Sequence, residues 1–580
     1  MTPNQCNQAP ALRWLSPTWG FVLFLAILGG YRFTLIGKGH FYWADEGCYL
    51  PAANLVDAVS AGHWRDAIES LFVAPRPVPP ARPGFVVLGV IPTIAQRVTN
   101  PWLGISPQTP ASFDVVAGFN VLVSLAVTIC VYAIGMLWTR SRAYSLLLAV
   151  VYSLLVNANV WICHLVPYQV SLLCFLLALW LISWIAQSGK SQIGGMMVAG
   201  FLTAWGYACY PGHYAFVVIN AAAALGSMLT RTQDRDGPQR FVDSRCGVPP
   251  REWSRPWRQV STLILAFGGS CLAVIAGLEG LSRLVGRSYL HDLAALSGSV
   301  TMGDSREGFN FIWRYLRDVE GPVGVALFVL FFDFILRRWG RRSTSLPPVA
   351  RAAILAAVAC YLLHASASFL LGRLVWYGRV LSVYLPFLVT GGIIALMQVR
   401  RPGVRRVGVS FLLAASIVSF LRFAVGYHRI TYPAEFLQKS MGSTGRDIVY
   451  PSNILWGYIG GDLSETVEAF DPRIVNVVDT MADGCDNYVR FASFAKARAS
   501  GAEFIGVNLE WSRYVRKAYE AFDPPPGYRL LAEAPHPDRF PAHQYEGRKP
   551  WERTRLHDRP LTLRLYQRED GRTADSHAKP

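Results

Sequence analysis

Apolar residues along the first 427 positions gather in blocks of about twenty, separated by short polar or basic segments. A helix of that length crosses the ~30 Å hydrocarbon core of a bilayer. The pattern therefore predicts a polytopic α-helical membrane protein. Its transmembrane helices are expected at about residues 19–36, 114–137, 143–162, 169–186, 193–209, 213–229, 260–281, 321–336, 350–370, 380–398 and 407–425.

One further apolar stretch, residues 85–96, is shorter than a bilayer crossing requires. We expect it to be interfacial or re-entrant. The alternative is a true crossing, which would reverse the sidedness of everything after it. The first apolar block has no small-residue cleavage site, so it is expected to stay as the first helix and not to be removed as a signal peptide.

Basic residues mark one side of this topology. If the N-terminus is cytoplasmic, the loops after the second, fourth, sixth, eighth and tenth helices are cytoplasmic too. Those loops carry Arg140 and Arg142, Lys190, the Arg231–Arg258 series, Arg337–Arg342 and Arg400–Arg406. This is the positive-inside bias of inner (plasma) membrane proteins. The segments 37–113 and 282–320, and the tail, then face outward.

The tail, residues 428–580, is more polar and is predicted to be a small extracytoplasmic α/β domain. Short strands are expected at 448–450, 474–478, 504–507, 528–531 and 563–566, with helices at 487–500 and 511–522. The chain thus divides into a transmembrane module, 1–427, with outer loop 37–113, and a domain at 428–580.

The stretch from Phe41 to Leu50 is the most informative part of the outer loop. Three aromatic residues follow the first predicted helix, as is typical of a membrane–water interface, and the carboxylates of Asp45 and Glu46 come next. Apolar residues at Tyr49, Leu50, Ala53, Val56 and Val59 then predict an amphipathic helix on the membrane surface. The acidic pair is either a catalytic base at the bilayer edge or simply the N-cap and first-turn charge of that helix.

The net charge of +17 is accounted for by the basic loops, so it does not indicate a nucleic-acid partner. The Arg231–Arg258 series is also suited to anionic headgroups of membrane lipids. The ten cysteines form no C-x-x-C pair, which disfavours a structural zinc site. Cys48 and Cys485 are both expected outside, where a disulfide between them is one option.

Two long outward segments, with the acidic pair outside the helices, favour an enzyme at the outer face. A transporter would more often carry ionisable groups at mid-membrane. A transporter or flippase for lipid-linked saccharide remains the alternative, and a non-catalytic assembly factor is a third.

The layout resembles the GT-C membrane glycosyltransferases, especially the protein O-mannosyltransferase and aminoarabinose-transferase group (family 39-like). Asp45-Glu46-Gly47-Cys48-Tyr49 is similar to that group's D-E-x-x-Y element. Two further segments are similar to its basic Pro-Pro stretch and to its Arg-Tyr-x-x-x-x-x-Pro element, namely Pro79–Gly84 and Arg379–Phe387.

This resemblance implies a sugar donor on a polyprenyl phosphate and an inverting transfer. Asp45 would be the base that takes the acceptor's hydroxyl proton, and Glu46 would position the acceptor or support Asp45. A lipid phosphate leaves readily and needs cations more than a proton, so Arg379 and Arg82 would hold it. Tyr49 would belong to the same substrate site. No cofactor or metal is implied, since the outer loop lacks a D-x-D pair.

The sequence departs from this group in two places. The loop from Asn157 to Tyr168 lacks the second acidic residue that many relatives carry. His164 or Tyr168 would then contact the substrate in its place, or His164 is simply structural. The basic Pro-Pro stretch is replaced by Arg82-Pro83-Gly84. These departures leave the sugar and the acceptor (lipid, glycan or protein) open.

Overall fold

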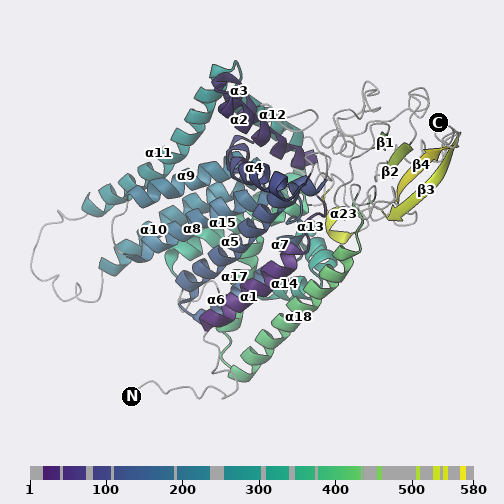
Figure 1. Cartoon of the computed structure of the whole chain (residues 1–580). Helices are drawn as coiled ribbons and strands as arrows, with labels where there is room; N and C mark the ends of the chain where they lie inside the picture. Colours follow the sequence, from purple (N-terminus) through teal and green to yellow (C-terminus); the bar gives the residue numbers. More distant parts are fainter. Residues whose placement is uncertain are drawn as a thin grey trace, which may run out of the picture.

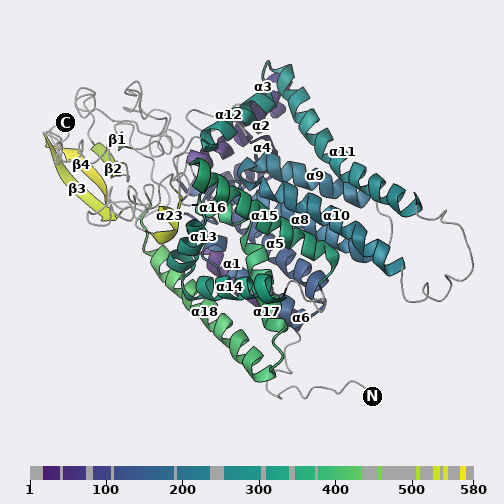
Figure 2. The same ribbon diagram turned by 180° about the vertical axis from the view of Figure 1, so that it is seen from behind.

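The computed structural model describes residues 17–39, 44–72, 82–105, 110–188, 193–235, 254–301, 308–338, 346–372, 376–432, 436, 454–459, 504–509, 527–535, 540–546 and 562–569. It is a helical bundle with a small sheet at one end (Figures 1 and 2). In the described residues, five helices are long and apolar enough to cross a membrane: Ala111–Thr139, Tyr168–Ser188, Ser261–Leu284, Pro348–Leu371 and Pro402–His428. The protein is therefore a multi-pass membrane protein.

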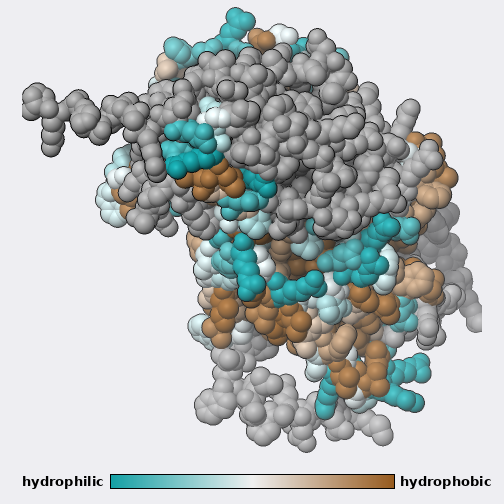
Figure 3. All heavy atoms as spheres, turned by 90° about the vertical axis from the view of Figure 1, so that its right-hand side faces the viewer, coloured by the Kyte–Doolittle hydropathy of each residue, from teal (hydrophilic) through white to brown (hydrophobic). Residues whose placement is uncertain are grey.

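The other predicted transmembrane helices correspond to shorter apolar helices. These are Trp19–Phe33, Arg142–Ser153, Ile193–Cys209, Ala215–Ser227, Pro322–Leu336 and Leu385–Met397. Each predicted span thus has a helix, while the number that cross stays a prediction. Figure 3 shows apolar residues gathered as a band on one face, with hydrophilic residues above it. Leu265 and Leu272 of the helix Ser261–Leu284 are more than 70% exposed, as lipid-facing side chains are.

The membrane module is built from helices α1 to α18. Their bounds are α1 Pro17–Phe33, α2 Leu50–Ser60, α3 Trp64–Phe72, α4 Pro83–Trp102, α5 Asp114–Thr139, α6 Arg142–Ser153, α7 Asn157–Val160, α8 Tyr168–Ser188, α9 Ile193–Cys209, α10 Ala215–Arg235, α11 Ser254–Leu284, α12 Tyr289–Thr301, α13 Asn310–Tyr315, α14 Pro322–Asp333, α15 Pro348–Leu371, α16 Gly378–Leu381, α17 Leu385–Met397 and α18 Pro402–His428. Short turns of other helical types are η2 Ala44–Tyr49, η3 Pro110–Phe113, η4 Pro211–His213, η6 Leu316–Glu320 and η7 Phe334–Arg338.

One predicted helix in this module was too long: the span expected at 143–162 ends as a helix at Ser153. The stretch 85–96 is part of the 20-residue helix α4, which is not among the helices long and apolar enough to cross a membrane. The described residues of segment 282–320 include α12, α13 and η6.

A helix follows the acidic pair, as predicted; it is α2, and it buries one face against the protein. Pro51, Ala52, Leu55 and Ala58 are buried, whereas Val59 is 43% exposed. The reason is packing against α4: a Cβ on Gly89 would lie 2.9 Å from the Cβ of Ala52. The two helices approach closely on that side, which turns the other apolar positions outward.

The tail contributes a four-stranded sheet of order β1-β2-β4-β3, in which β1 and β2 are parallel and the other pairs antiparallel. The strands are β1 Ile454–Ile459, β2 Phe504–Leu509, β3 Tyr528–Pro535 and β4 Thr562–Arg568, and helix α23 spans Pro541–Gln544. Three predicted strands are confirmed as β2, β3 and β4, and β1 was not predicted. The predicted strands at 448–450 and 474–478 and the helices at 487–500 and 511–522 lie outside the described residues.

Candidate functional site

A buried irregular loop, residues 154–167, is the structural centre of the site. All of its residues are buried, although it joins α6 to α8 with only the short helix α7 inside. Backbone N–H and C=O groups that are buried need partners, because an unpaired one costs about 1–3 kcal/mol. Polar side chains from distant helices supply those partners here.

Two buried charged residues bind α7. The Glu320 carboxylate accepts the backbone N–H groups of Val156 (2.7 Å) and Asn157 (2.9 Å). Burial raises the pKa of Glu320 to about 7, and these two hydrogen bonds act in the opposite direction. Arg32 of α1 donates to Asn159 Oδ1 at 3.0 Å. Arg32 lies within the first predicted transmembrane helix and is 1% exposed, and it was not among the predicted site residues.

Glu46, in the segment 37–113, connects that segment to the same buried loop. Its Oε1 accepts the N–H of Leu165 at 2.7 Å, and its Oε2 lies 3.4 Å from His164 Nδ1. Both side chains are fully buried, and burial lowers the pKa of His164 to about 3. His164 also packs against Gly39, where a Cβ would lie 2.7 Å from His164 Cε1 and where φ is +78°. Glu46 and His164 thus connect two loops more than 100 residues apart.

Asp45 lies in η2, and helix α2 begins only at Leu50 with Tyr49 as its N-cap. The N-cap explanation for Asp45 on α2 is therefore wrong, and Glu46 contacts the loop at 154–167 and not the first turn of α2. The side chain of Asp45 is outside what the structure describes. Tyr49 is buried between α2 and α4, with its hydroxyl 2.7 Å from Thr93 Oγ1.

Arg82 and Arg379, which are far apart in the sequence, approach one aromatic cluster. The Arg82 guanidinium lies 4.9 Å from the ring centroid of Tyr210, and that ring contacts Tyr168 edge-on at 4.7 Å. Arg379 Nη1 donates to the Tyr168 hydroxyl at 2.9 Å, and its guanidinium lies 4.5 Å from the Tyr377 ring. Three residues proposed from sequence, Arg82, Tyr168 and Arg379, are thereby brought together.

His213 packs edge-on against Tyr210, with ring centroids 4.8 Å apart, and is neutral. Its Nδ1 is 3.0 Å from Ser171 Oγ, and its Nε2 is 3.0 Å from Ser382 Oγ. Burial lowers the pKa of His213 to about 3, and the charges of Arg82 and Arg379 lower it further, against a backbone hydrogen bond that raises it. The imidazole therefore adds no third positive charge to the cluster.

Close backbone packing fixes Arg82 in this position. A Cβ on Gly84 would lie 2.8 Å from the backbone nitrogen of Cys209, so only glycine permits the start of α4 to approach the end of α9. Tyr210 follows Cys209 directly. The same contact therefore sets the height of Arg82 over the Tyr210 ring.

Arg82, Arg379, Tyr168 and Tyr210 form what we call the arginine cluster. Trp161 separates the Glu46–His164 pair from this cluster. Its ring centroid is 5.8 Å from that of His164 and 5.5 Å from that of Tyr168. The two halves of the candidate site thus share one buried aromatic wall. The loop at 154–167 lacks the second acidic residue of the resembling family, and at its start the buried Glu320 carboxylate accepts two backbone N–H groups.

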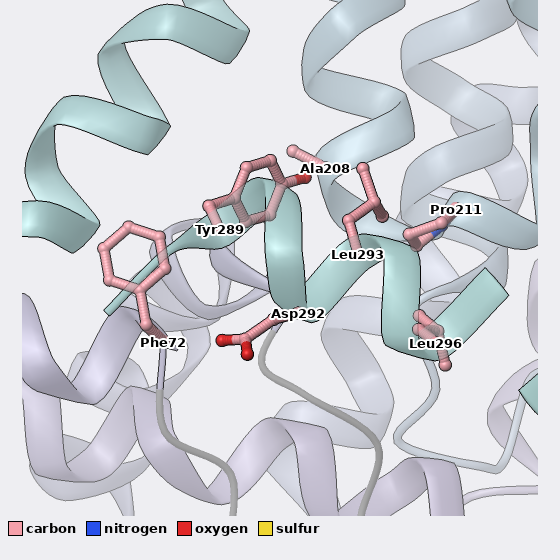
Figure 4. Close-up of a pocket in the computed structure, with 7 residues that line it drawn as sticks. All are labelled: Phe72, Ala208, Pro211, Tyr289, Asp292, Leu293 and Leu296. Carbon is pink, nitrogen blue, oxygen red and sulfur yellow. The ribbon is translucent and has the colours of Figure 1, made fainter. Parts of the chain in front are cut away.

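A recess lies on the far side of the Tyr210–Pro211 turn (Figure 4). It is lined by Phe72, Ala208, Pro211, Tyr289, Asp292, Leu293 and Leu296. Asp292 is the one carboxylate among them, and it lies 3.9 Å from Arg287, which donates to the Phe72 carbonyl. Apart from Asp292 and Tyr289, the side chains that line the recess are apolar. Among the described residues, no group of three or more metal-ligating side chains is found.

The arrangement of these helices is the GT-C fold. The fold is shared with the crystal structure of ArnT from Cupriavidus metallidurans bound to undecaprenyl phosphate, at a TM-score of 0.51 and 11% sequence identity, over 98% of this chain and 100% of that chain. The apo structure of the same ArnT gives a TM-score of 0.49 at 11% identity, over 95% and 98%. No family model and no curated protein match the sequence.

Glu46→Ala is expected to destabilise the protein by on the order of 2 kcal/mol, because it leaves the buried Leu165 N–H without its acceptor. Glu46→Gln, which keeps an acceptor, is expected to cost less. Unfolding in detergent with increasing SDS measures both. Glu69→Ala, an exposed carboxylate on α3, is the control. A Glu46→Ala variant as stable as wild type would contradict the stabilising role of Glu46 as acceptor of the Leu165 N–H.

Proposed function

We propose that this protein is a membrane glycosyltransferase of GT-C type. It moves a sugar from a polyprenyl-phosphate donor to an acceptor at the extracytoplasmic face of the inner (plasma) membrane. The observation that carries the proposal is the convergence of Arg82 and Arg379 on Tyr168, Tyr210 and the neutral His213. The undecaprenyl phosphate bound to the ArnT of the same fold supports a lipid phosphate as ligand.

Two arginines suit a phosphate ligand for a physical reason. A guanidinium is planar, stays charged and donates two parallel hydrogen bonds to phosphate oxygens. Both arginines are largely buried: Arg82 is 4% exposed, and the Arg379 side chain is 16% exposed. Low surrounding polarity strengthens their attraction for an anion. They would hold the phosphate as negative charge develops on it during transfer.

The transfer itself needs one base. Asp45 takes the proton from the acceptor hydroxyl, whose oxygen attacks the anomeric carbon from the face opposite the phosphate. The bond from that carbon to the phosphate oxygen breaks, polyprenyl phosphate leaves, and the configuration inverts. Glu46 is fully buried, so of its two predicted roles we propose the supporting one. Tyr49 and His164 would shape the site through their buried contacts.

The topology completes the proposal. The N-terminus is cytoplasmic, the segment 37–113 is the catalytic outer loop, and residues 428–580 form an extracytoplasmic domain that covers the site. The sugar and the acceptor, whether lipid, glycan or protein, are chosen by surfaces beyond the arginine cluster.

The direct test incubates the purified protein in detergent with a panel of polyprenyl-phosphate sugars and follows release of polyprenyl phosphate. Turnover of one donor is expected, with the product's anomeric configuration inverted relative to the donor. Transfer with retention would exclude the single-base mechanism. Movement of lipid-linked saccharide across the membrane of proteoliposomes, without release of polyprenyl phosphate, would instead identify a flippase.

A further inference from the structure

The C-terminal segment Phe540–Glu546 is anchored on the membrane module. Gly378 N–H donates to the Tyr545 carbonyl at 2.9 Å, and the Tyr545 hydroxyl donates to Asp318 Oδ2 at 2.5 Å. The Tyr545 ring meets Tyr315 edge-on at 5.4 Å. Figures 1 and 2 both show α23, which belongs to this segment, beside α13 of the module. A residue after α23 is thereby held against the arginine cluster.

That residue is Glu546. Its Oε1 accepts the backbone N–H of Arg379 at 2.8 Å, and its Oε2 lies 3.6 Å from Arg379 Nε. Its side chain is 1% exposed. A Cβ on Gly378 would lie 2.6 Å from Glu546 Oε1, so the carboxylate sits directly on the backbone before Arg379. Tyr168 and Glu546 contact Arg379 on two edges and fix the plane of its guanidinium.

The negative charge of Glu546 affects the binding of the donor and of the released product differently. The proposed donor is a phosphodiester with one negative charge. The released polyprenyl phosphate is a monoester whose second ionisation has a pKa of about 6, so it carries nearly two negative charges at pH 8. A fixed carboxylate beside the phosphate site repels the second charge as well as the first. Its repulsion is therefore greater for the product than for the donor.

We propose that Glu546 is a specificity-determining residue of the phosphate site, which weakens the binding of the monoester product relative to the diester donor. The inference rests on the proposed function, since it takes Arg379 as a phosphate ligand. Glu546 positions Arg379 and at the same time limits how tightly the spent lipid is held. The C-terminal segment thus supplies part of the site from 167 residues beyond Arg379.

The test measures binding of undecaprenyl phosphate and of its methyl diester to the full-length protein in detergent at pH 8. Wild type is compared with Glu546→Gln, whose amide oxygen still accepts the Arg379 N–H. We expect Glu546→Gln to bind the monoester about tenfold more tightly and the diester by a smaller factor. Glu546→Asp, which keeps the charge, should leave the ratio of the two affinities unchanged. The matched control is Glu533→Gln, since Glu533 pairs with Arg564 on the sheet.

The outcomes separate the inference from the function. Equal gains for both lipids in Glu546→Gln, or no gain, overturn the inference while the phosphate site stands. Wild type that binds neither lipid overturns the proposed function and the inference with it. If Glu546→Gln does not fold, the wild-type ratio decides. We expect the monoester to bind at most a few-fold more tightly than the diester, and a preference above tenfold overturns the inference.

Discussion

Asp45→Asn is expected to reduce sugar transfer by about a thousandfold, within the 10²–10⁴ that a general base typically contributes. The asparagine amide has the size of the carboxylate but does not take the acceptor's proton. Donor binding should be retained, because we propose that Arg82 and Arg379, and not Asp45, hold the phosphate. The measurement is release of polyprenyl phosphate, followed with saturating donor and acceptor.

The matched control for this variant is Asp57→Asn. Asp57 lies in the same segment, 37–113, on α2, and pairs with Arg97, with its side chain 65% exposed. Its loss should leave transfer unchanged. A well-folded Asp45→Asn protein with wild-type turnover would show that Asp45 is not the base. Loss of turnover in both variants would point to disruption of the outer segment as a whole.

Much of this fold is readable from sequence because each transmembrane helix carries its own signal. Length and apolarity act locally, so every predicted span meets a helix. Breaks in such a helix are not local. The helix expected over 143–162 ends at Ser153 because Glu320 and Arg32, from elsewhere in the chain, satisfy the backbone and side chains that follow.

The candidate site could be predicted only where a short segment resembles a family element or departs from one. Arg82, Tyr168 and Arg379 were picked out of separate segments, and packing of Gly84 and Tyr210 brings them together. Glu546 gave no signal, because a carboxylate in a polar tail is ordinary. Its importance comes only from where the C-terminal segment meets Gly378. Arg32 did give a signal in the sequence, because it is a cation within an apolar block.

Arg379→Ala is expected to lower kcat/KM for the donor by about a hundredfold, the loss of one or two charge-assisted hydrogen bonds to phosphate. The same change leaves the Glu546 carboxylate buried beside an empty position. Removing one partner of a buried charge pair is strongly destabilising. A loss of activity in Arg379→Ala alone therefore does not distinguish misfolding from loss of donor binding.

Arg379→Lys separates the two effects. Lysine keeps a positive charge near Glu546, so the thermal stability in detergent should fall little. It loses the planar, bidentate contact with phosphate, so KM for the donor should rise about tenfold. Arg283→Lys, 66% exposed at the end of α11, is the control. Tyr168→Phe, which removes the hydroxyl that accepts from Arg379, should raise KM by a smaller factor in the same direction. If Arg379→Lys binds and turns over the donor as wild type does, a point charge is enough at this position, and the bidentate phosphate contact is wrong.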